Sequence, residues 1–337
     1  MARDRISFTT FNLLNFQEAG RPMNRGQAPW TPAQVEAKVG WTAGMLRRAE
    51  ADVIGFQELW SREPLDEALE RAGLDATHDL LVRPGAGDRI DCAAAVRRGL
   101  LVGEPEWIEG FPPALRLEAE GDDPQTPLMA VRIDAFSRPV LRFQVDDEGE
   151  HPVAIHVCHL KSKRPTEVFR ESWFDRDLHG NHATALGSAL STIRRTAEAA
   201  ALRVLLTDAM QGNAVPTVVM GDLNDGEGGP VLALATEEPP FLWPQRRGGR
   251  DTALYSGQGM QQAQSQRDVY FTYIHEDVHS SLDHVLVSRE FYSQSTTRVW
   301  ALDGLDIWND HLNVDAAERA QGANDHGVVR ARFSRPR

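Results

Sequence analysis

The sequence predicts an α/β fold, because short apolar segments alternate with helical patterns along the chain. Eight segments are rich in Val, Ile, Leu or Phe and are bounded by Gly, Pro, Asp or Asn, which is typical of strands. These segments are residues 6–13, 52–57, 92–96, 128–136, 153–160, 215–220, 281–287 and 327–333. Strands interleaved with helices are the pattern of an α/β architecture.

Three helices are predicted between these strands. Thr31 and Pro32 make a good helix start, because the hydroxyl can cap the helix and proline fits its first turn. An apolar stripe predicts a longer helix over residues 187–210, and a shorter candidate covers residues 63–71. The two segments expected to be long loops are residues 162–186 and 241–267.

The chain has 337 residues with no linker-like stretch and no internal repeat, so we expect one domain spanning residues 1–337. The N-terminus has no apolar segment of signal-peptide length, and nothing approaches the roughly 20 apolar residues that span a bilayer. We therefore expect a cytoplasmic protein with no membrane contact, of unknown oligomeric state. Cys92 and Cys158 lie in apolar runs and are expected to be small buried hydrophobes.

The charge balance bears on which partners the protein can bind. The formal net charge is −13, and 25% of the residues are charged. Tight, sequence-independent binding of duplex DNA usually requires a basic surface, so this balance counts against a high-affinity duplex binder. It does not exclude a nuclease, because local patches and a bound divalent cation determine the field at a site.

Polar side chains gather where several of the apolar segments end. Asp222 and Asn224 follow one strand in the sequence GDLN, Glu58 follows another, and Asn12 interrupts the first. Ligand sites in α/β sheets form at the carboxyl ends of strands, and carboxylates there suit a hard cation. Taken singly, GDLN is also typical of a turn, and Asn12 of a backbone cap.

Three further motifs place imidazoles beside charged groups. His159 ends a strand in HLKSK, and Lys161 follows it, so this pair suits an anionic phosphate. Asp283 precedes a strand in SLDH, and Asp325 with His326 precedes the last strand in NDHG. A histidine with carboxylates available is typical of a proton-handling imidazole.

Together, the motifs FNLLNF, QE, HLKSK, GDLN, SLDH and NDHG resemble the endonuclease/exonuclease/phosphatase (DNase I-like) superfamily, nearest its bacterial extracellular-nuclease branch. The resemblance runs from Asn12 to His326. It implies a four-layer α/β sandwich, in which two mixed sheets pack face to face with helices outside and the site lies at one rim.

The resemblance also implies a metal site. Glu58 would be the principal ligand, with Asn12 beside it and Asp325 near the ion. Asn12 and Asn224 would in addition contact the substrate, Asn224 by holding a phosphoryl oxygen. Because the ligands are oxygen-rich, the expected ion is Mg²⁺ or Mn²⁺.

The same resemblance implies roles for the remaining residues. Asp222 would position or deprotonate the attacking water. His326, oriented by Asp283, would contact the scissile phosphate and handle a proton. His159 would bind phosphate or protonate the leaving group, and Asp91 is the candidate for the carboxylate that orients it.

The expected function is therefore metal-dependent phosphodiester hydrolysis, with DNA or RNA as the leading substrate. One alternative is a phosphatase or phospholipase that acts on a small phosphoester or a sphingomyelin-type substrate. An alternative of another class is a non-catalytic binding scaffold, which would be expected to lack the metal glutamate, the GDLN aspartate or the terminal histidine.

Overall fold

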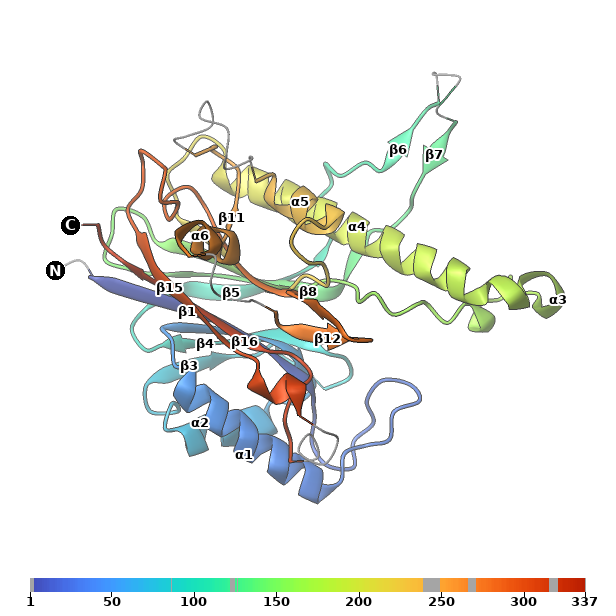
Figure 1. The fold of residues 1–337 in the computed structure, drawn as a ribbon, viewed down its shortest axis with the longest axis horizontal. Coiled ribbons are helices and arrows are strands. Elements are labelled where there is room, and N and C mark those ends of the chain that lie inside the picture. The colour runs from blue at the N-terminus through green and yellow to red at the C-terminus, as the bar shows by residue number, and fades with distance from the viewer. Residues whose placement is uncertain are drawn as a thin grey trace.

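The computed structural model describes residues 3–85, 87–121, 125, 127–238, 249–265, 271–314 and 321–336. Two six-stranded sheets pack face to face, and helices cover their outer surfaces, so the expected four-layer α/β sandwich is confirmed (Figure 1). None of the described helices combines the length and the apolar composition of a membrane-spanning segment.

The first sheet has the order β15-β16-β1-β2-β4-β3. Its central strands β1 and β2 are parallel, and the other neighbours are antiparallel, so the sheet is mixed. Its strands are β1 (Arg5–Phe16), β2 (Val53–Leu59), β3 (His78–Leu81), β4 (Asp91–Arg97), β15 (Ala301–Trp308) and β16 (Val328–Ser334).

The second sheet has the order β11-β14-β10-β9-β8-β5 and is also mixed, because only β9 and β10 are parallel. Its strands are β5 (Leu101–Gly110), β8 (Ala135–Val145), β9 (Val153–His159), β10 (Thr217–Asp222), β11 (Tyr255–Ser256) and β14 (Asp283–Val287). Each sheet thus has a parallel pair at its centre, and the two pairs pack against each other.

Helices α1 (Pro32–Arg48) and α2 (Glu63–Ala72) cover the first sheet, while α4 (Ala183–Met210) and α5 (Pro230–Thr236) cover the second (Figure 1). Thr31 caps α1 in a capping box with Gln34, so the predicted helix start is confirmed. The remaining described elements are β6 (Glu118–Ala119), β7 (Met129–Ala130), β12 (Tyr273–His275), β13 (Val278–Ser280), α3 (Arg176–His179), α6 (Gly257–Gln264) and three 3₁₀ turns (Val168–Arg170, Gly180–His182 and Asp310–Asn313).

Successive side chains along β9 and β10 point alternately between the two sheets and toward the outer helices. Val157 and Met220 point between the sheets, where they pack with Phe8 and Phe333. Cys158 follows Val157, and Leu223 lies three positions after Met220. Both point to the opposite face of the sheet, toward α4 and α5. Both cysteines are buried and free, as expected.

Three expectations about the elements are wrong. The apolar run 128–136 is not one strand, because Met129–Ala130 pairs with β6 and the chain enters the second sheet only at Ala135. The segment 162–186 contains two 3₁₀ turns, α3 and the start of α4 rather than a plain loop. The described part of 241–267 contains β11 and α6, and residues 241–248 and 266–267 lie outside the described ranges.

Candidate active site

The candidate site lies at the edge where the two central parallel pairs end. The carboxyl ends of β1 and β2 carry Asn12 and Glu58, and those of β9 and β10 carry His159 and Asp222. Asp283, the first residue of β14, pairs with Asp222 across the second sheet. The packing of β1 and β2 on β10 and β9 therefore brings polar groups from five strands to one rim.

The backbone at this rim has conformations that are costly for residues with a side chain. Glu58 has a φ of 62° and Asn224 a φ of 53°, both in the left-handed region. Gly221 has a φ of 146°, and a Cβ at this position would lie 1.8 Å from the carbonyl oxygen of Cys158. The glycine of GDLN is thus required by the close approach of β10 to β9.

Asp222 is at the centre of the cluster and is 1% exposed. Its Oδ2 accepts a hydrogen bond from Asn12 Nδ2 at 3.3 Å and lies 3.5 Å from His159 Nε2 and 3.9 Å from His326 Nε2. Its Oδ1 accepts the backbone N–H of Asn224 at 2.8 Å. Burial is the main cause that raises the pKa of Asp222 to about 7.

Asn224 is held by two bonds that the GDLN turn creates. Besides the bond from its backbone to Asp222, its Nδ2 donates to the carbonyl oxygen of Leu160 at 3.0 Å. The amide is therefore fixed across the ends of β9 and β10. No described residue forms a hydrogen bond with its Oδ1 or its second N–H, so both stay available for a ligand.

Glu58 faces Asp222 from the other sheet. Its Oε2 accepts the backbone N–H of Asn15 at 2.9 Å, and its Oε1 lies 3.5 Å from Asn12 Nδ2 and 3.9 Å from His159 Nε2. Burial raises the pKa of Glu58, and the charge of Asp325 raises it further. The rim thus gathers carboxylates whose mutual repulsion a cation would relieve.

The oxygen atoms at this rim fit a hard divalent cation. Glu58 and Asp222 present carboxylates on either side of Asn12, and Asp325 is close enough to raise the pKa of Glu58. Asn12 turns its Nδ2 toward the two carboxylates, while its Oδ1 accepts the N–H of Leu14 at 3.0 Å and keeps one lone pair. Asp325 is half-buried and forms no hydrogen bond with any other part of the described chain.

Asp283 and His326 form a buried pair, with Asp283 Oδ2 and His326 Nδ1 2.8 Å apart. Burial opposes charge on the imidazole, but the carboxylates of Asp283 and Asp222 outweigh it and raise the pKa of His326 well above its usual value. The ligating atoms of Asp222, Asp283 and His326 lie within 4.8 Å of one another. Because the ring is already hydrogen-bonded, this trio is better suited to holding a proton than an ion.

The surroundings of His159 disfavour a charged ring, in contrast to those of His326. Burial, together with the positive charges of Arg138 and His326, lowers its pKa well below the usual value, so the ring is neutral. Its Nδ1 is buried and has no hydrogen-bond partner in the described chain. The expectation that Asp91 orients this ring is wrong, because no hydrogen bond or ion pair joins Asp91 to His159 in the described chain; Asp91 Oδ2 instead accepts a hydrogen bond from Arg83 at 2.8 Å.

Lys161 lies beside the cluster rather than in it. Its Nζ donates to oxygen atoms of Ser162 and Arg164, and it lines an open pocket of about 260 Å³. Arg138, on β8, lines the same pocket, and its charge acts on both Glu58 and His159. Sequence reasoning missed Arg138, because the segment Ser-Arg-Pro that contains it does not resemble a strand.

Two more residues missed by sequence reasoning contact the site. Asn324 donates its Nδ2 to the backbone carbonyl of Asn12 at 2.5 Å, which ties the NDHG segment to β1. Tyr273 places its ring 4.8 Å from the ring of His326. The adjacency of Asn324 to Asp325 is the one sequence signal that points to the first of these.

Solved structures share the whole fold at low sequence identity. TDP2 from D. rerio, complexed with a single-strand DNA product, is 12% identical with a TM-score of 0.56, covering 98% of this chain and 99% of that chain. An endonuclease/exonuclease/phosphatase from Bacteroides vulgatus is 12% identical with a TM-score of 0.54, covering 98% and 99%. The human Nocturnin catalytic domain, with a bound sulfate anion, is 14% identical with a TM-score of 0.53, covering 99% and 96%.

No curated protein matches the sequence. The family model described as the endonuclease/exonuclease/phosphatase family matches residues 9–308, which include Asn12, Glu58, His159, Asp222 and Asp283. The chain belongs to the endonuclease/exonuclease/phosphatase family.

Proposed function

We propose that the protein is a divalent-metal-dependent phosphodiesterase, a nuclease that hydrolyses DNA or RNA within one domain comprising residues 1–337. Members of its family hydrolyse phosphoester bonds and generally use a divalent metal. The observation that supports the proposal most strongly is the position of Asp222. One carboxylate oxygen faces Asn12, the neutral His159 and the His326–Asp283 pair at 3.3 to 3.9 Å.

In this proposal Glu58, Asp325 and Asn12 hold Mg²⁺ or Mn²⁺ at the rim. When bound, the cation offsets the negative charge that develops on the non-bridging phosphoryl oxygens. The backbone of Glu58 is in the left-handed region, and its Oε1 lies 3.5 Å from the Asn12 Nδ2 that also contacts Asp222. Asn324 keeps Asn12 in place through the 2.5 Å bond to its backbone carbonyl.

The remaining residues carry the proton transfers and bind the phosphate. Asp222 orients the attacking water and accepts its proton, and Asn224 holds a phosphoryl oxygen with its fixed amide. His326, kept cationic by Asp283, donates a hydrogen bond to the scissile phosphate. His159 lies 3.5 Å from Asp222, and its neutral imidazole can donate an N–H hydrogen bond to an oxygen of the phosphate or of the leaving group.

The pocket beside His159 supports a substrate with more than one phosphate. It is lined by three cations, Arg89, Arg138 and Lys161. Arg89 is paired with Glu109, whereas the side chains of Arg138 and Lys161 form no ion pair with a carboxylate in the described ranges. A phosphate next to the scissile one would be drawn to these two charges, despite the net charge of −13.

A side-by-side assay tests this function. Purified protein is incubated with plasmid DNA, RNA, a phosphomonoester and sphingomyelin, each with Mg²⁺ and with excess chelator. We expect cleavage of nucleic acid that the chelator abolishes, with little turnover of the other two substrates. Preferential hydrolysis of sphingomyelin or of the phosphomonoester would contradict the nuclease proposal while leaving the phosphoesterase class intact.

A further inference from the structure

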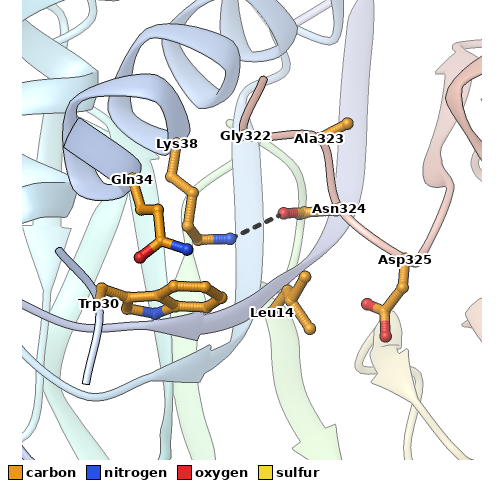
Figure 2. A pocket seen from close by; sticks show the side chains of 8 residues that line it. All are labelled: Leu14, Trp30, Gln34, Lys38, Gly322, Ala323, Asn324 and Asp325. Atoms are coloured by element: carbon orange, nitrogen blue, oxygen red, sulfur yellow. Dashed lines mark hydrogen bonds between the residues drawn. The ribbon is translucent and has the colours of Figure 1, made fainter. Parts of the chain in front are cut away.

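A second cavity borders the metal site on the side of α1. Its volume is about 160 Å³. Figure 2 shows it between Trp30 and Leu14 on one side and Lys38 and Asn324 on the other. Asp325 stands at its edge, so the cavity and the proposed metal site share a wall.

Lys38 is an unusual residue for the wall of a cavity. It is 3% exposed and has no carboxylate partner in the described part of the chain. Within the described chain its Nζ has one hydrogen bond, to Asn324 Oδ1 at 3.4 Å, and it lies over the rings of Trp30 and Phe16, at 5.4 and 5.8 Å from their centres. An ammonium has three donors, so two protons of this buried group have no oxygen or nitrogen acceptor among the described residues. Such a group is costly unless a ligand supplies one.

The anchoring of Trp30 shows that the cavity is a built feature of the site. Its Nε1 donates to the backbone carbonyl of Asn15 at 2.8 Å, and the N–H of Asn15 donates to Glu58. The indole is therefore positioned by the same loop that holds the proposed metal ligand. A ring stacked on this indole would occupy the cavity that Asp325, a proposed metal ligand, also lines.

The lining selects a planar, uncharged group with a carbonyl. Trp30 and Leu14 offer apolar surface, and Gln34 and Asn324 offer amides. A phosphate is disfavoured, because Asp325 and Glu58 lie close enough to Lys38 for their negative charges to act on it. Burial outweighs these charges and lowers the pKa of Lys38 to about 8, so the side chain still carries its proton at neutral pH.

We propose that this cavity binds the nucleobase of a nucleotide adjacent to the scissile phosphate. The base packs against Trp30 and accepts a hydrogen bond from Lys38 through a ring carbonyl. The inference rests on the proposed nuclease function, and it makes Trp30 and Lys38 substrate-binding residues that select nucleotides over other phosphodiesters.

The test compares substrates with and without a base. The p-nitrophenyl esters of thymidine 5′-phosphate and thymidine 3′-phosphate carry a base on either side of the phosphorus, whereas methyl p-nitrophenyl phosphate carries none. We expect Trp30→Leu, which removes the aromatic face, and Lys38→Met to lower kcat/KM about 10-fold for at least one thymidine ester. The methyl ester should change less than twofold. Arg47→Met, which removes an exposed cation from the same helix, is the matched control.

A binding measurement separates this inference from the proposed function. Calorimetry with thymidine 5′-monophosphate should give an affinity that Lys38→Met weakens about 10-fold, whether or not any ester is hydrolysed. If the variants lose activity equally on all three esters, or bind the nucleotide as tightly as wild type, Lys38 only positions Asn324 and the inference is overturned. If wild type hydrolyses no ester yet binds the nucleotide through Lys38, the inference stands and the nuclease proposal fails.

Discussion

Asp283 Oδ2 lies 2.8 Å from Nδ1 of His326, and both side chains are buried at the rim shared by the two sheets. This contact fixes the ring so that its Nε2 faces Asp222. The carboxylate also stabilises the protonated imidazole, which an amide at the same position would not do.

The first prediction concerns this contact. Asp283→Asn should lower kcat about 100-fold or more, with a much smaller change in KM, because the imidazolium would lose its charge partner at the scissile phosphate. Steady-state kinetics on a phosphodiester checks this, and a thermal melt monitors the fold. A kcat within threefold of wild type would show that Asp283 is not needed to hold His326 in its working form.

The second prediction concerns the metal. Mg²⁺ should raise the melting temperature, because the carboxylates that bind it are brought together only in the folded state. There the ion also relieves their mutual repulsion. The gain in unfolding free energy is about 2.7 kcal/mol at 100 times the dissociation constant. Glu58→Gln should abolish this rise, whereas Glu63→Gln, at an exposed position on α2, should preserve it. An equal Mg²⁺ effect in both variants would place the ion elsewhere.

The third prediction concerns Gly221. Gly221→Ala places a Cβ 1.8 Å from the Cys158 carbonyl oxygen, so β10 must move away from β9. We expect the unfolding free energy to fall by about 3 kcal/mol or more, and activity to be lost because Asp222 moves with its strand. Gly40→Ala is the control, since a Cβ there meets nothing within 4 Å and alanine favours the helix. Comparable stability of the two variants, measured by urea unfolding, would refute the close approach.

The fourth prediction concerns pH. His156 is buried in β9, and burial lowers its pKa from 6.5 to about 4. Between these values the unfolded chain binds a proton that the folded chain does not, so this residue makes stability fall as pH decreases from 6.5 to 4. The loss is on the order of 3 kcal/mol. Urea unfolding across this range should show that the unfolding free energy of His156→Phe declines less steeply with falling pH than that of wild type. The control His275→Gln, at an exposed position, should show the same decline as wild type. Parallel profiles for wild type and His156→Phe would contradict a neutral buried His156.

Sequence reasoning worked where a polar residue interrupts or ends an apolar strand. Seven of the eight expected strands are present, with ends shifted by up to three residues. The structure also brings the motif residues to one rim, because the parallel pairs β1–β2 and β9–β10 end there. A strand end is visible in sequence since the hydrophobic pattern stops at it.

Other features depend on contacts that no local pattern reveals. Arg138 lies on β8, which is not recognisable as a strand in the sequence because Pro139 interrupts it. Lys38 forms a hydrogen bond with Asn324, which is 286 residues away in the sequence. The edge strand β5 has mostly half-buried or exposed residues and includes Glu104, Pro105 and Glu106, so it lacks the apolar signature of the inner strands. Helix α6 consists of Gly, Gln, Met and Ala and has no hydrophobic stripe that would predict it. Its one local signal is the N-cap, Ser256.

The most direct test of the whole account is the turnover of Asp222→Asn on circular DNA with Mg²⁺. This change keeps the size of the side chain and removes the negative charge that Asn12, His159 and His326 face. We predict that wild type nicks the plasmid, that chelator stops it, and that the folded variant loses at least 1,000-fold in rate, on the order expected for a proton acceptor. Cleavage by the purified variant at a rate near that of wild type would contradict the central claim.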